Sequence, residues 1–215
     1  MKLIDALLDL LYPRRCVFCC RLTQGGATVC PHCRDTLPYT KAAAEQHFPH
    51  LSACCSPLYY TDTVRSSLLR YKFGGRSVYA ECYGEFLAKC IDENHISCDS
   101  ITWTPLSRQR LRKRGYDQAR LLAQELSRRT GLPCISTLRK LRNNPAQSST
   151  GNAQKRKQNV RGVYALQKGV SVQGRRILLV DDIVTTGATL SACAEVLKKA
   201  GAAEITAVTL ARSKA

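Results

Sequence analysis

The fold of this chain is decided by one stretch, ILLVDDIVTTGAT, which spans residues 177–189. Its first half is apolar and predicts a buried strand, and its second half is a small, hydroxyl-rich turn that leads into a helical pattern over residues 190–200. Two adjacent carboxylates, Asp181 and Asp182, stand at the junction. A turn at a helix N-terminus offers backbone N–H groups to a phosphate, and carboxylates bind sugar hydroxyls or a hard metal ion. The stretch therefore predicts a site for a phosphorylated sugar.

The same stretch resembles, over its whole length, the phosphoribosyl-pyrophosphate (PRPP) signature of type I phosphoribosyltransferases. The resemblance implies that the ribose 5-phosphate is surrounded by the residues of the turn, Thr185, Thr186, Gly187, Ala188 and Thr189. It also implies that Asp181 and Asp182 are the catalytic pair, facing the ribose 2- and 3-hydroxyls or their Mg2+. The alternative is an ordinary buried strand followed by an acidic turn and a capped helix, which seldom needs both the acidic pair and the TTGAT sequence.

Strand-like and helix-like segments alternate along the rest of the chain. Helices are expected over residues 63–73, 77–92 and 116–130, and strands over residues 100–104, 162–166, 176–180 and 205–210, with 59–60 opening another. Residues 37–58 are expected to be irregular. This alternation predicts an α/β fold with a parallel sheet flanked by helices. The ligand of such a sheet lies beyond the carboxyl ends of its strands, which is where the acidic pair stands.

Two closely spaced cysteine pairs lie near the start of the chain, Cys16 with Cys19 and Cys30 with Cys33. Two such pairs close a tetrahedral four-thiolate site that suits Zn2+. A complete thiolate shell leaves no position for water, so the zinc is expected to be structural and to hold together a knuckle too short for its own core. Two alternatives stay open: a redox dithiol, and Cys20 as the ligand in place of Cys19.

Composition narrows the class of protein and its partners. The chain has 215 residues with 12 cysteines, and its 33 Lys and Arg against 16 Asp and Glu give a formal net charge of +17. That charge favours an anionic partner, although a solvated basic face is the alternative. With no secretory signal and no apolar run long enough for a transmembrane helix, a cytoplasmic protein is expected. We expect an N-terminal helix and knuckle over residues 1–40, and a second domain over residues 55–215. The helix, at residues 2–11, is expected to pack on that domain or to touch a membrane surface.

A dense run of cations follows the strand expected at residues 100–104. It consists of Arg108, Arg110, Arg112, Lys113 and Arg114. As a loop at the sheet edge that carries the acidic pair, this run is expected to bind pyrophosphate or DNA phosphates, because forked guanidinium groups match phosphate oxygens. A second basic stretch, residues 139–161, is expected to be either a lid or a disordered loop, and it contributes Arg156 as a further candidate. The knuckle arginines Arg14, Arg15 and Arg21 either face an anion or are merely solvated.

Together these features resemble the ComF/GntX family of competence and DNA-utilisation proteins, which combine a zinc knuckle with a phosphoribosyltransferase-like domain. The family pattern PVPL…RGFNQA appears here at residues 104–106 and 114–119, and its later Q…R..N pattern appears as Gln147, Arg156 and Asn159. Asp117 stands where the family usually has Asn, which adds a negative charge.

The resemblance implies a role in natural transformation or in the use of external DNA as a nutrient. Internalised single-stranded DNA would lie along the basic segments and the knuckle, with bases stacked on exposed tyrosines. The DNA-uptake machinery at the inner face of the membrane is the expected protein partner. Two alternatives stay open: an active, Mg2+-assisted phosphoribosyltransferase of nucleotide or nucleobase salvage, for which the sequence shows no base-recognition pocket, and a PRPP sensor.

Overall fold

A five-stranded parallel sheet forms the centre of the molecule. The computed structural model describes residues 14–40, 47–142 and 162–214. The sheet consists of β1 (Ala53–Cys55), β2 (Leu58–Tyr59), β3 (Ser100–Trp103), β6 (Arg176–Val184) and β7 (Glu204–Arg212). Its order is β1-β7-β6-β3, and β2 pairs with β7 further along the same edge as β1. The parallel α/β architecture expected from the sequence is therefore confirmed.

The two central strands are buried on both faces, as their continuous apolar sequences require. Ile177 and Leu179 of β6 pack into one apolar cluster, whereas Leu178 and Val180 pack into another on the opposite face. This alternation follows from the period of two along a strand. It places the two faces of β6 in contact with different helices.

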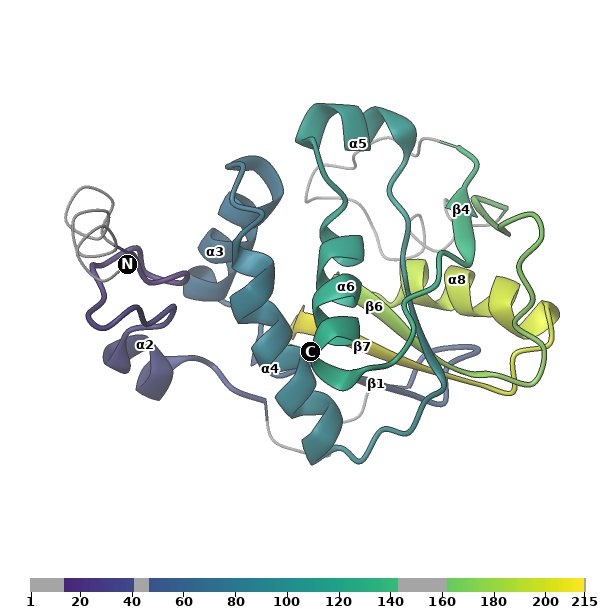
Figure 1. Cartoon of the computed structure of the whole chain (residues 1–215), viewed down its shortest axis with the longest axis horizontal. Helices are drawn as coiled ribbons and strands as arrows, with labels where there is room; N and C mark the ends of the chain where they lie inside the picture. Colours follow the sequence, from purple (N-terminus) through teal and green to yellow (C-terminus); the bar gives the residue numbers. More distant parts are fainter. Residues whose placement is uncertain (1–13, 41–46, 143–161, 215) are drawn as a thin grey trace.

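Helices cover both faces of the sheet (Figure 1). One face packs with α3 (Asp62–Phe73), α4 (Tyr79–Glu93) and α6 (Gln118–Thr130), and the other with α8 (Ala188–Lys199). The short helix α2 (Pro31–Thr36) belongs to the cysteine knuckle, which lies beside α3 and α4 at one end of the molecule. Among the described residues, no helix has the length and apolar character needed to cross a bilayer.

The arginine-rich segment is a helix, α5 (Arg108–Arg114), and not the loop that its composition suggested. Ser107 caps its N-terminus by accepting a hydrogen bond from the backbone N–H of Arg110 at 3.4 Å. Gly115 ends the helix in the left-handed conformation, with φ of 80°. Serine before a helix and glycine after it are the residues that stabilise such ends. In a helix the cationic side chains project from different faces, so only some of them can point towards one site.

Three smaller differences concern strands. The stretch 37–58, expected to be irregular, contains β1. The strand expected over residues 162–166 is β5 (Tyr164–Leu166), and it pairs antiparallel with β4 (Leu138–Lys140) in a separate two-stranded ribbon. β6 continues to Val184, so the acidic pair lies inside the strand. The helix expected over residues 2–11 lies outside the described residues.

Candidate functional site

The acidic pair is held near the end of β6 and faces a lysine from α3. Nζ of Lys72 lies 2.9 Å from Oδ1 of Asp182, and the two side chains are 18% and 11% exposed. Oδ1 of Asp181 accepts a hydrogen bond from the backbone N–H of Asp182 at 2.8 Å. Lys72 is a site residue that the sequence did not reveal, because it comes from a distant helix and belongs to no recognisable pattern. The structure thus brings one cation to two adjacent acids.

The surroundings of Asp181 disfavour a second negative charge. Burial and the neighbouring Asp182 raise the pKa of Asp181 above its ordinary value, while the positive charge of Lys72 lowers it. Two carboxylates in such a setting are stabilised by any cation that approaches them. The pair is therefore suited to bind a metal ion or to accept hydrogen bonds from hydroxyl groups.

The hydroxyl-rich turn follows β6 directly and opens α8. Gly187 is the N-cap residue of that helix and has φ of 68°. A side chain there would be strained, and its Cβ would also lie 2.1 Å from Cδ1 of Phe48. Glycine is therefore required both by the backbone conformation and by the packing of the phenylalanine ring. The turn stands at a helix N-terminus, as the sequence predicted, with its backbone N–H groups available to an anion.

The acidic pair and the hydroxyl-rich turn both line one cavity of about 450 Å³. Of the predicted residues, Asp181, Asp182, Thr185 and Thr189 line it, whereas Thr186, Gly187 and Ala188 are not among its lining residues. Lys72 lines it from α3, and residues 104–106 close it after β3. The carboxylates and the turn thus share one space beyond the carboxyl ends of the strands, where parallel sheets bind ligands.

The helical form of α5 decides which of its cations reach this cavity. Arg110 and Arg114 line it, because residues four apart lie on one face of a helix. Arg112 and Lys113 are exposed and line no part of this cavity, and Arg108 points into a neighbouring one. The remaining predicted cation, Arg156, lies outside the described residues.

Arg114 is fixed by the elements around it. Its Nη1 donates to Oε1 of Gln118 at 2.7 Å, and its guanidinium lies 4.8 Å from the ring centre of Phe73. Burial lowers the pKa of Arg114, and the negative charge of Asp182 opposes that change. The last turn of α3 therefore supplies two groups to the site, the ammonium of Lys72 and the aromatic face of Phe73.

The β4–β5 ribbon adds two residues that the sequence did not reveal. Lys140 and Tyr164 line the cavity, with Nζ of Lys140 lying 5.2 Å from the ring centre of Tyr164. Burial and the nearby positive charge of Arg110 lower the pKa of Lys140, which Asp181 partly counteracts. Cations from α3, α5 and the ribbon thus surround the two carboxylates.

Asp117 has a structural role that explains its place in the pattern at residues 114–119. Its Oδ1 accepts from the N–H of Arg120 at 3.2 Å, which caps α6, and its Oδ2 accepts from the N–H of Leu106 at 3.0 Å. Burial raises its pKa. Asp and Asn cap helices about equally well, so the departure from Asn keeps the cap. The second hydrogen bond anchors the segment that closes the cavity.

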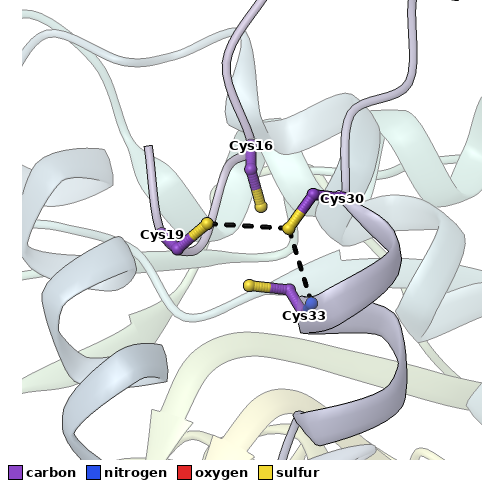
Figure 2. Close-up of side chains that lie close together, drawn as sticks. All are labelled: Cys16, Cys19, Cys30 and Cys33. Carbon is purple, nitrogen blue, oxygen red and sulfur yellow. Dashed lines mark hydrogen bonds between the residues drawn. The ribbon is translucent and has the colours of Figure 1, made fainter. Parts of the chain in front are cut away.

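The four predicted zinc ligands form a compact cluster (Figure 2). The ligand atoms of Cys16, Cys19, Cys30 and Cys33 all lie within 4.8 Å of one another. Sγ of Cys19 lies 3.6 Å from Sγ of Cys30, close to the roughly 3.8 Å edge of a tetrahedron with Zn–S bonds of about 2.3 Å. Cys20 is not part of the cluster. In the described parts of the chain this is the one group of His, Cys, Asp or Glu with such spacing.

The first turn of the knuckle, at residues 17 and 18, packs against α3 and α4. Phe18 is 1% exposed and packs against aromatic rings of α4. The backbone oxygen of Val17 accepts hydrogen bonds from the hydroxyl of Ser67 at 2.6 Å and from Nη2 of Arg70 at 3.0 Å. The same Nη2 donates to the oxygen of Phe18 at 2.6 Å. The knuckle is therefore continuous with the apolar cluster of α3, α4 and α6.

Two of the knuckle arginines bind the knuckle itself. Nη1 of Arg15 donates to the backbone oxygen of Cys20 at 3.2 Å, and Nη1 of Arg14 donates to that of Gly26 at 3.4 Å. These hydrogen bonds give both side chains a role in closing the loop between the cysteine pairs. A contact with an anion is not needed to explain them.

Comparison with known proteins agrees with this geometry. Residues 112–215 match the family model described as phosphoribosyl transferase domain, and residues 7–46 match the one described as double zinc ribbon domain. The DNA utilization protein YhgH of Escherichia coli (strain K12) is 29% identical over 208 residues, covering 92% of this chain and 90% of that protein. The competence protein ComFC of Bacillus subtilis (strain 168) is 33% identical over 162 residues, covering 72% of this chain and 62% of that protein.

The chain belongs to the ComF family. The two matching family models give the combination that the sequence pattern indicated, a zinc-ribbon segment at the N-terminus followed by a type I phosphoribosyltransferase fold. The cluster fits a structural zinc ion, because the four cysteines of this chain supply a complete set of four ligands. Among solved structures, a glutamine PRPP amidotransferase from B. subtilis complexed with ADP and GMP is 24% identical with a TM-score of 0.44. That match covers 65% of this chain and 30% of the amidotransferase.

Proposed function

We propose that this protein acts in DNA uptake and utilisation, that it binds PRPP with Mg2+ in the cavity around Asp181 and Asp182, and that it handles internalised single-stranded DNA. The observation that carries the proposal is the convergence of the acidic pair and the phosphate-binding turn on one cavity rimmed with cations. The names of the relatives in E. coli and B. subtilis, DNA utilization protein and competence protein, support the cellular role.

Each part of PRPP has a matching group in the cavity. The 5-phosphate fits the turn at the N-terminus of α8, where backbone N–H groups and the helix dipole favour an anion. The ribose hydroxyls fit Asp181 and Asp182. The pyrophosphate fits Arg110 and Arg114, whose positive charges face the acids across the cavity. Mg2+, when bound, would neutralise charge between the pyrophosphate and the carboxylates.

Calorimetry with PRPP and Mg2+ tests this assignment. Replacing Asp181 and Asp182 together by Ala is expected to abolish binding while the protein remains folded. Arg114→Ala is expected to weaken binding by about tenfold or more, as the loss of a charge-assisted hydrogen bond does. Arg112→Ala is the matched control, because it removes the same charge from the same helix outside the cavity. Equal affinities in all these variants would remove PRPP from the proposal.

The DNA-binding part is tested separately. Single-stranded DNA should bind with an affinity that falls steeply as salt rises, because each neutralised phosphate releases counterions. Undetectable binding at low salt would refute this part and leave the PRPP site untouched. We place the protein in the cytoplasm, with the uptake machinery at the inner face of the membrane as its partner.

An active phosphoribosyltransferase of nucleobase salvage is the second candidate, favoured by the intact acidic pair in the cavity. It requires a base or amine that consumes PRPP and releases pyrophosphate. If PRPP binds but no member of a nucleobase panel releases pyrophosphate, the site acts as a sensor and the second candidate fails.

A further inference from the structure

A second and larger cavity of about 910 Å³ lies on the other side of residues 105–106. It is bounded by the edge of β3, by α5 and α6, and by β4 with the two residues after it. The two cavities share a wall that consists of Pro105, Leu106, Asp117 and Lys140. Neither the PRPP signature nor the zinc knuckle contributes a residue to the lining of this larger cavity. The features assigned so far therefore do not explain it.

The charges that line this cavity are almost all positive. They belong to Arg108, Arg120, Arg139, Lys140 and Arg142. The one acid in the lining, Asp117, already accepts backbone hydrogen bonds with both of its oxygens. Among the residues that the structure describes, none of the four arginines forms an ion pair. The cavity is therefore suited to a ligand with negative charge.

The same cavity contains an aromatic surface. Trp103, the single tryptophan of the chain, lines it and is partly exposed. The guanidinium of Arg120 lies 5.9 Å from the centre of its ring. Aromatic rings stack with nucleobases of any sequence, and guanidinium groups bind phosphate through paired hydrogen bonds. Gln124 and Gln167 add amide groups that can pair with the edge of a base.

We propose that this cavity is a binding site for a mononucleotide, separate from the PRPP site. The base stacks on Trp103, and the phosphate is held by the arginines of α6 and β4. The volume lies within the range of roughly 300 to 1,000 Å³ that is typical of small-molecule pockets. The combination of a partly exposed indole ring and several cations selects a ligand that carries both a base and a phosphate. An anion without a base would leave the aromatic surface unused.

The fluorescence of Trp103 provides a direct test, because no other tryptophan contributes to the signal. Deoxyadenosine 5′-monophosphate is titrated into the whole protein at low salt, with inorganic phosphate and deoxyadenosine titrated in parallel. The nucleotide is expected to quench the fluorescence with saturation, and to bind about tenfold or more tightly than either part alone. Equal effects of the nucleotide and of deoxyadenosine would overturn the role of the arginines.

Variants then locate the site. Replacing Arg120 and Arg139 by Gln is expected to weaken nucleotide binding by tenfold or more, and both side chains are exposed enough to leave the fold intact. Replacing Arg112 and Lys113 by Gln removes the same charge from outside both cavities and is expected to leave affinity within about threefold, because exposed charges act weakly over distance. An equal loss in the two double variants would show a general effect of net charge and overturn the site.

Two further outcomes would refute the proposal. If replacing Asp181 and Asp182 by Ala abolishes quenching while the arginine variant keeps it, the nucleotide binds in the PRPP cavity. If oligodeoxynucleotides quench and the mononucleotide does not, the cavity is a segment of a longer nucleic-acid track. Calorimetry on Trp103→Leu, which needs no optical signal, is expected to show weaker binding, and an unchanged affinity would exclude stacking on this ring.

Discussion

The ion pair between Lys72 and Asp182 is the contact whose removal tests the structure of the site most directly. It joins a helix from the first third of the chain to the acidic pair of β6, with 2.9 Å between the charged atoms. The perturbation is Lys72→Met, which keeps the apolar stem and removes the ammonium group. Asp182 then lies beside Asp181 without its ion-pair partner, so the variant should unfold more easily.

The size of the effect follows from the burial of the pair. Removing one partner of a fully buried ion pair destabilises a protein by about 3 to 5 kcal/mol, whereas exposed pairs contribute about 0 to 1 kcal/mol. With side chains 18% and 11% exposed, water screens the pair in part, and we expect about 2 kcal/mol for Lys72→Met. Asp182→Asn leaves the ammonium near Asp181 and should cost about 1 kcal/mol. The double variant should cost about 1 to 1.5 kcal/mol, well below the sum.

Urea unfolding at low ionic strength measures this cycle, with the free energy of unfolding of all four proteins extrapolated to water. Lys89→Met is the matched control. It breaks an ion pair with Glu93 at 3.6 Å whose side chains are 74% and 53% exposed, so its effect should stay below about 0.5 kcal/mol. Additivity of Lys72→Met and Asp182→Asn within about 0.5 kcal/mol would show that the two residues do not interact, and would refute the placement of Lys72 in the site.

Three other changes have defined outcomes. Cys19→Ser should lower the bound zinc from about one ion per chain towards none, whereas Cys20→Ser should retain it, as metal analysis of the purified proteins would show. The pKa of Asp181 is higher in the folded state than in the unfolded state, so protonation of this carboxyl favours folding, and that contribution to stability is lost as pH rises through the folded pKa. Asp181→Asn should therefore stabilise the protein at pH 8. At about pH 3, below the unfolded pKa, urea titrations should show no such stabilisation. Gly187→Ala should cost about 2 to 4 kcal/mol in denaturant unfolding, from backbone strain and crowding together, whereas Gly169→Ala, with φ of 76° and open space around it, should show the strain alone.

The parts of the fold that were predictable are those whose sequence pattern agrees with their tertiary environment. The apolar run of β6 indicated a buried strand, and it is one. The helix α5 was missed because it has a single apolar residue, Leu111, and so no apolar stripe; its readable signals were Ser107 before it and Gly115 after it. The strand β1 is three residues long and owes its form to pairing with β7, which local sequence does not encode.

The residues of the candidate site also fall into those that the sequence revealed and those that it did not. The acidic pair and the turn are adjacent in sequence, so one pattern revealed both, and the cavity contains Asp181, Asp182, Thr185 and Thr189 together. Lys72 and the two ribbon residues come from elements far apart in the chain, and only tertiary packing brings them near the acids. The roles given to all these residues, like the division at residues 1–40 and 55–215, stay predictions.

A single helix connects the zinc knuckle to the acidic pair, which gives a physical reason for the two units to occur in one chain. Ser67 and Arg70 of α3 hold the backbone oxygens of the knuckle, and Lys72, in the last turn of the same helix, holds Asp182. The knuckle is too short to keep its shape without a metal, so its contacts with α3 depend on the four thiolates. A zinc ion bound by the four cysteines would hold the knuckle against one part of α3, while Lys72 of the same helix forms the ion pair with Asp182.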